Sequence, residues 1–155
     1  MLDDNVYRVL VFLHLVAAMA WIGGGFYFHY KFTMLRRAKD NVAILALGQE
    51  VEQVGNRIFI PASGVVLLMG ILMVAFGPYG LELWIWLALA GYAVTFLTGA
   101  LFIGPTSGRL AKAAEQLGPD APEVASQRDR LITIARIDYV VLLLIVLDMV
   151  YKPGA

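Results

Sequence analysis

The sequence predicts an all-α integral membrane protein, a four-transmembrane-helix bundle with helical extensions into the cytoplasm. Of the 155 residues, 60% are hydrophobic, whereas an ordinary soluble domain is about 45–50% apolar. The apolar residues also gather in four long segments. Each segment is near or above the ~20 residues that a helix needs to cross the hydrocarbon core of a bilayer. We therefore expect one integral membrane domain over residues 1–155.

The four predicted spans lie at about Val6–Tyr30, Ile58–Phe76, Leu83–Ile103 and Leu131–Tyr151. The first segment differs from a signal peptide, because Asp3 and Asp4 stand where basic residues are usual. Its apolar run is also longer than the core of a signal peptide. We expect it to remain in the protein as a membrane span.

Basic residues are distributed unevenly between the predicted loops. Two lie near the chain ends, Arg8 and Lys152. Nine follow the first or the third span: Lys31, Arg36, Arg37, Lys39, Arg57, Arg109, Lys112, Arg128 and Arg130. Because short cytoplasmic loops carry an excess of lysine and arginine, this pattern places both long loops in the cytoplasm and both termini outside. The expected location is the inner (cytoplasmic) membrane, with several passes.

The two long loops carry the signals of helices that extend the spans. Asp40 and Asn41 are good N-cap residues, and Val42–Asn56 has a helix-compatible pattern, so the second helix is expected to begin well before the membrane. The segment Gly118–Pro122 predicts a break, with its last proline in the first turn of the helix that follows. Between these signals, Arg109–Leu117 is expected to form a short interfacial helix.

Composition excludes several classes of function. The chain contains no cysteine, so disulfides, thiolate metal sites, iron–sulfur clusters and covalently attached haem are excluded. The formal net charge is zero, which offers no electrostatic reason for binding nucleic acid. The expected partners are the lipid bilayer and either a second copy of the chain, as a homodimer, or a larger membrane complex.

The fourth predicted span contains ionisable residues whose partners can be predicted from depth. Asp138 is expected to face the bundle and to pair with Arg57 or Arg136, because an unpaired carboxylate at that depth is costly. Asp148 lies closer to the outer surface, level with Arg8, and an ion pair at the rim of the bundle is the expected arrangement.

The first span contains both histidines of the chain, His14 and His29. At ~100° per residue, His14, Trp21 and Gly25 fall close to one line, where small neighbours allow a helix or a porphyrin to approach. A histidine in mid-membrane is a functional candidate; the alternative is a packed helix with one hydrogen-bonded imidazole. The two histidines are ~22 Å apart along the helix, too far to ligate one haem from both sides. We expect His29 to be an interfacial residue.

A family resemblance rests on the same helix. His14, Trp21, Gly24 and Tyr27 form a His-x6-Trp-x2-Gly-x2-Tyr pattern. It resembles the first helix of the HemJ family, membrane-embedded protoporphyrinogen oxidases that contain haem, and is similar to a helix of the CopD copper-resistance domain. The likeness continues with Pro61, Gly70 and the closing Lys152-Pro153. The resemblance implies that His14 is a haem-linked histidine.

The third helix differs from HemJ, since Leu87–Gly104 has neither the lysine nor the histidine of that family. We therefore expect an uncharacterised membrane family related to HemJ and CopD. The expected function is binding of b-type haem (haem b) in electron transfer or a membrane redox reaction; an enzyme of this kind would be a haem-dependent membrane oxidoreductase. His14 is the expected metal ligand, and the other expected cofactor-binding residues are Trp21, Gly24, Gly25 and Tyr27. The alternative is a cofactor-free accessory or structural subunit of a larger membrane complex. A third reading, copper handling, finds poor ligands in two distant histidines.

Overall fold

The structure is a computed structural model that describes residues 3–154, and its elements there are all helical. The first long helix is α1 (Asp4–Ala38). The second consists of α2 (Asn41–Val54), the π-helical turn η1 (Gly55–Phe59) and α3 (Ile60–Phe76). The third consists of α4 (Leu83–Leu97), the π-helical turn η2 (Thr98–Ile103) and α5 (Gly104–Leu117). The fourth is α6 (Pro122–Tyr151). The prediction of an all-α fold is confirmed.

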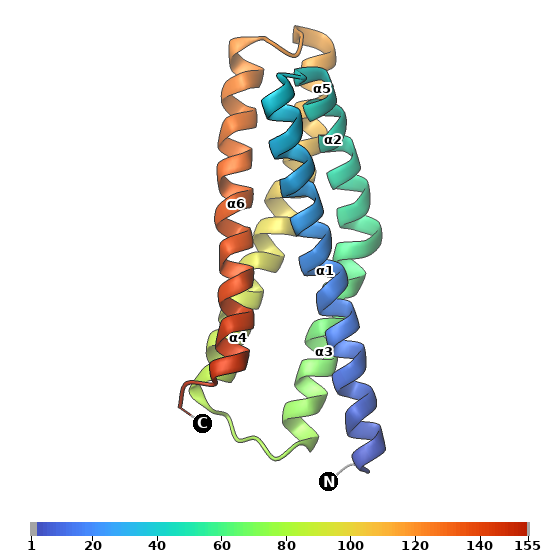
Figure 1. The fold of residues 1–155 in the computed structure, drawn as a ribbon, viewed down its shortest axis with the longest axis vertical. Helices are drawn as coiled ribbons and strands as arrows, with labels where there is room; N and C mark the ends of the chain where they lie inside the picture. Colours follow the sequence, from blue (N-terminus) through green and yellow to red (C-terminus); the bar gives the residue numbers. More distant parts are fainter. Residues whose placement is uncertain (1–2, 155) are drawn as a thin grey trace.

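The four long helices run along one common axis, with both ends of the chain at the same end of the bundle (Figure 1). The connection 77–82 lies at that end, and the two turns that follow α1 and α5 lie at the other. Lys152 donates a hydrogen bond of 3.1 Å to the hydroxyl of Tyr79 in this connection. The nearby ammonium group lowers the pKa of the Tyr79 phenol. The last turn of the chain is thereby fixed to the loop between the second and third long helices.

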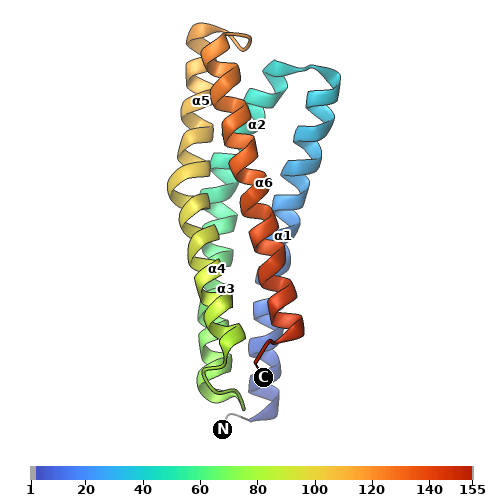
Figure 2. The same cartoon turned by 90° about the vertical axis from the view of Figure 1, so that its left-hand side faces the viewer.

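The helices pack mainly as pairs. Helix α1 packs along α3, and α4 packs along α6, while α1 and α6 meet over a shorter stretch. At the other end of the bundle, α2 packs along α5 (Figures 1 and 2). The lower part of the bundle in Figure 1 therefore consists of two helix pairs, α1–α3 and α4–α6, that face each other across the axis.

The helix ends follow the predicted capping signals. The Asp40 side chain accepts a hydrogen bond of 2.9 Å from the backbone N–H of Ala43, which caps α2. Gly118 ends α5 with a φ of 92°, a conformation that favours glycine, and Pro122 occupies the first turn of α6. The expected short helix Arg109–Leu117 is wrong as a separate element, because α5 continues α4 through η2.

Each π-helical turn ends two positions before a proline. The N–H of Ile60 bonds to the carbonyl of Gly55, and the N–H of Gly104 to that of Gly99. Pro61 and Pro105 follow these residues. Since a proline ring clashes with the carbonyl four residues earlier, the wider π-turn takes up the displaced backbone. The helix continues past each proline, and η1 and η2 lie against each other.

The two halves of the bundle differ in how deeply their side chains are buried. Buried apolar clusters lie where α2 and α5 meet each other and the ends of α1 and α6. They contain Leu45, Leu110, Ala114, Val124 and Leu131, and Phe32, Ile44 and Leu47. Towards the chain ends, many large apolar side chains are exposed instead, as expected where lipid covers them.

Three helical segments are long and apolar enough to cross a membrane, by length and composition: Asp4–Ala38, Asn41–Phe76 and Leu83–Leu117. Helix α6 has 30 residues, which is long enough, but Arg136, Asp138 and Asp148 interrupt its apolar stretch. A multi-pass membrane protein is thus supported by three segments.

Candidate functional site

His14 lies at the contact between α1 and α3 and is buried, with 8% of its surface exposed. Its Nδ1 is 2.9 Å from the backbone carbonyl of Val66, and since a carbonyl only accepts, Nδ1 carries the proton of this hydrogen bond. A Cβ atom added at Gly70 would lie 3.5 Å from Cε1 of the ring. Within residues 3–154, Nε2 has no hydrogen-bond partner. The ring is therefore fixed by α3 and keeps one free nitrogen.

A small cavity lies beside His14. Its volume is about 50 Å³, and side chains of α1, α3, α4 and α6 line it, including Trp21, Tyr92 and Met149. The Trp21 ring meets the Tyr92 ring edge to face, with 5.7 Å between centroids. The predicted neighbour Trp21 is thus close to His14, and Met149 is a sulfur-bearing neighbour that helix periodicity alone did not reveal.

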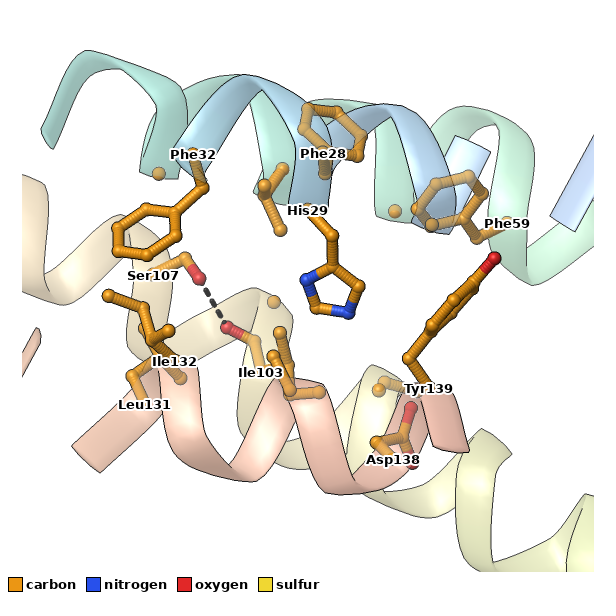
Figure 3. Close-up of a pocket in the computed structure, with 18 of the residues that line it drawn as sticks. Phe28, His29, Phe32, Phe59, Ile103, Ser107, Leu131, Ile132, Asp138 and Tyr139 are labelled. Atoms are coloured by element: carbon orange, nitrogen blue, oxygen red, sulfur yellow. Dashed lines mark hydrogen bonds between the residues drawn. The ribbon is translucent and has the colours of Figure 1, made fainter. Parts of the chain in front are cut away.

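A larger cavity follows along the bundle axis. It has a volume of about 200 Å³, and Trp21 and Leu142 line both cavities. Its walls come from α1, α6 and both π-helical turns, and His29 projects into it (Figure 3). His29 was expected to be an interfacial residue. Its side chain instead points towards the interior of the bundle and lines this cavity. His14 and His29 therefore line different cavities.

The glycines of α1 bring aromatic side chains against its backbone. A Cβ atom at Gly25 would lie 3.1 Å from the ring of Tyr139, and one at Gly24 would overlap the ring of Phe59. The Tyr139 ring also meets the His29 ring edge to face, with 4.9 Å between centroids. The close approach that was expected at Gly25 is made here by a ring of the same chain, and Gly24 is approached in the same way.

The hydroxyl groups around the larger cavity are already bonded to their own helices. Ser63 donates to the carbonyl of Ile60, and Ser107 donates to that of Ile103 over 2.7 Å, as Figure 3 shows for the latter. Thr95 is within 3.2 Å of the carbonyl of Gly91. These hydroxyl groups are hydrogen-bonded within their own helices, so they are less available to a ligand than His29 and Asp138, which also line the cavity.

Asp138 faces the bundle, as predicted, but the predicted ion pair is wrong. Its Oδ1 atom is buried and has no hydrogen-bond partner among the described residues. Arg57 is exposed, and Arg136 lies over the ring of Phe32 at 5.9 Å. Arg136 is two positions from Asp138 on the helix, and such residues do not face each other.

The rim pair predicted between Asp148 and Arg8 is also wrong. The Oδ2 atom of Asp148 is buried and has no partner within residues 3–154. The ion pairs within residues 3–154 join other residues: Lys31 with Glu50 at 2.7 Å, and Arg128 with Asp129 at 3.4 Å. The first joins α1 to α2, and the Glu50 carboxylate raises the pKa of Lys31.

Tyr27 is separated from the other residues of the predicted pattern. Its side chain is 52% exposed and lines neither cavity. The ammonium group of Lys31 lies 5.8 Å from its ring. The structure therefore brings Trp21, Gly24 and Gly25 to the interior, while Tyr27 faces outward, where an amphipathic ring suits a membrane interface.

The fold and these cavities define a class, that of small helical integral membrane proteins with a hollow between two helix pairs. Residues 8–153 match the family described as "Predicted integral membrane protein (DUF2269)", and the chain belongs to that family. No curated protein and no solved structure gives a significant match. The expected uncharacterised membrane family is confirmed, and a specific relation to HemJ or CopD stays a prediction.

Proposed function

We propose that the protein binds b-type haem through Nε2 of His14 and serves electron transfer or a redox reaction in the membrane. The observation that carries this proposal is the hydrogen bond from His14 Nδ1 to the Val66 carbonyl. Metal-ligating histidines usually donate their second ring nitrogen to a carbonyl or carboxylate in this way. Bound haem would supply one-electron chemistry, and the chain would supply the ligand and an apolar surrounding.

The donor atoms near His14 fit an iron porphyrin. The imidazole of His14 would hold the iron, and Met149, which lines the same small cavity, would offer a thioether as a second ligand. Tyr92 and Trp21 provide flat apolar surfaces beside it. The space of about 50 Å³ is smaller than a porphyrin, so binding requires the α1–α3 and α4–α6 pairs to stand further apart than they do here.

The test of this proposal is the absorption spectrum of protein purified from cells supplied with haem. We expect a Soret band, and a pyridine haemochrome assay that identifies protohaem at about one per chain. A colourless preparation that also fails to take up added haemin would overturn the proposal.

The orientation is proposed together with the function. We propose four spans, with α6 as the fourth, both termini outside and both extensions in the cytoplasm of a bacterial-type inner membrane. The two chain ends lie at one end of the bundle, as an even number of passes requires, and the nine bases gather towards the other. Lipid is the expected partner along the exposed apolar surface, and a homodimer or a larger complex remains part of the proposal.

Cysteine labelling tests this orientation, since the chain has no native cysteine. Glu123→Cys, at the start of α6, should react with a membrane-impermeant maleimide only after the cells are permeabilised. Gly80→Cys, where an added side chain meets open space, should react in intact cells. Labelling of Glu123→Cys but not Gly80→Cys in intact cells would reverse the orientation.

One observation favours the accessory-subunit alternative. The glycine face of α1 is filled by Tyr139 and Phe59, so these glycines already have a packing role without a cofactor. If the purified protein takes up no haem, His14 is a buried hydrogen-bonding residue and α1 is a packing helix of a larger membrane complex. Co-purification of a defined membrane partner with the tagged chain would then support that function.

A further inference from the structure

The side chains that line the larger cavity suit a flat apolar ligand. Its volume is about 200 Å³, and its lining includes the aromatic side chains of Trp21, Phe28, Phe59 and Phe96. Aromatic rings from three separate long helices thus surround one space. Ligand sites commonly combine such apolar walls with a small number of polar groups.

Two of the polar side chains that line this space come from opposite helices. His29 projects from α1, and Asp138 projects from α6, as Figure 3 shows. The His29 ring meets the ring of Tyr139 edge to face, and its ring nitrogens can exchange hydrogen bonds with a ligand. Oδ1 of Asp138 is buried without a partner among residues 3–154. A buried polar atom without a partner costs stability, so a ligand that bonds to it would remove that cost.

The charges around the cavity favour a neutral ligand. An anionic head group would stand beside the carboxyl group of Asp138, and a cationic one would share the cavity with Arg128. A neutral ring with oxygen atoms is repelled neither by the carboxyl group of Asp138 nor by the guanidinium group of Arg128. Its oxygens can exchange hydrogen bonds with an imidazole and a carboxyl group, both of which donate or accept according to their protonation.

We propose that this cavity binds the ring of a quinone or its quinol. His29 and Asp138 hold the ring oxygens, and the aromatic walls enclose the ring. An apolar ring that carries two oxygens and a lipid tail is the ligand class that combines these requirements inside a bilayer. The proposal does not depend on haem at His14, because that residue lines the other cavity.

The experiment measures binding of decylubiquinone, oxidised and reduced, to the purified full-length protein in nanodiscs of neutral phospholipid. The readout is quenching of tryptophan fluorescence, since Trp21 lines the cavity. We expect saturable quenching by at least one of the two forms. We also expect Asp138→Leu and His29→Phe each to raise the Kd about tenfold or more, the scale of one lost hydrogen bond to a buried group.

The matched control is Asp148→Leu, which changes the other carboxyl of α6 that has a buried, unpartnered oxygen. It should bind the probe like the wild type. Decylbenzene, which has the tail and ring but no oxygens, should compete poorly. The proposal is overturned by an absence of saturable quenching, by unchanged Kd values in both cavity variants, or by equal competition from decylbenzene. Tighter binding of decanoate than of the quinone would also overturn it.

Thermal unfolding separates loss of the ligand from loss of the fold. Asp138→Leu removes an unpartnered buried carboxyl, so it should raise the thermal midpoint of the ligand-free protein while it weakens binding. A merely structural role of Asp138 would lower the midpoint and binding together, and that result would contradict the proposal. His29→Phe keeps the aromatic contact with Tyr139 and should fold normally.

Discussion

His14→Ala should abolish the Soret band of the purified protein, while His29→Ala leaves it in place. Alanine offers no ligand atom, and the other histidine, ~22 Å away along the helix, projects into a different cavity. The expected loss is nearly complete, because a protein that holds haem by one strong ligand and one weak one retains little without the first. The absorbance ratio of haem to protein in matched preparations measures it.

Imidazole rescue is the control for this variant. The substitution also removes the hydrogen bond to Val66, so a loss of haem by itself does not distinguish a missing ligand from a disturbed helix contact. Free imidazole added to His14→Ala should restore part of the Soret band if the pocket is intact. Met149→Leu should shift the band rather than remove it. Equal loss of haem in the two histidine variants would contradict His14 as the ligand.

Gly48→Leu should destabilise the packing of α2 against α5. A Cβ atom at this position would lie 3.1 Å from the backbone carbonyl oxygen of Ser107. A backbone atom cannot rotate away, so α2 and α5 must move apart at this contact. Overpacking of this kind costs roughly 1–3 kcal/mol. At about 2–4 °C per kcal/mol for a chain of this size, the midpoint falls by several degrees.

Gly64→Leu is the matched control for this effect. Gly64 also lies within a helix, on α3, and an added Cβ atom there meets nothing within 4 Å. Both substitutions gain the same helix propensity, about 1 kcal/mol at most, so the difference between them isolates the contact with Ser107. Thermal unfolding in one detergent measures both. Equal midpoints would show that α2 and α5 are not packed as described.

The helices themselves were predictable from local signals. Apolar runs gave the membrane segments, and the caps at Asp40 and Pro122 gave the start of α2 and of α6. Apolar runs and helix caps depend only on residues that are close in the sequence, so a single sequence is enough to predict these helices. The fourth span is the exception, because charged residues in α6 weaken the composition signal while leaving the helix intact.

The site was only partly predictable, because it depends on which helix faces which. Helical periodicity put His14, Trp21 and Gly25 on one face, and the structure keeps that face inside. It did not reveal that Tyr139 would pack on Gly25. Nor did it reveal that Asp138 would have no cationic partner among residues 3–154, since the depth of a residue in the membrane does not fix the direction in which it points around the helix axis.

The π-helical turns determine where the chain tolerates changes of length. One residue more or less within Gly55–Phe59 or Thr98–Ile103 would rotate everything beyond it by ~100° about the helix axis. The clusters around Ile44 and Leu110 would then turn away from their partners. The connection 77–82 and the turn after α5 lie between helices, so a change of length there does not rotate a helix about its own axis. Natural insertions and deletions should therefore collect in those two loops, while the spacing between each π-turn and its flanking helices stays constant.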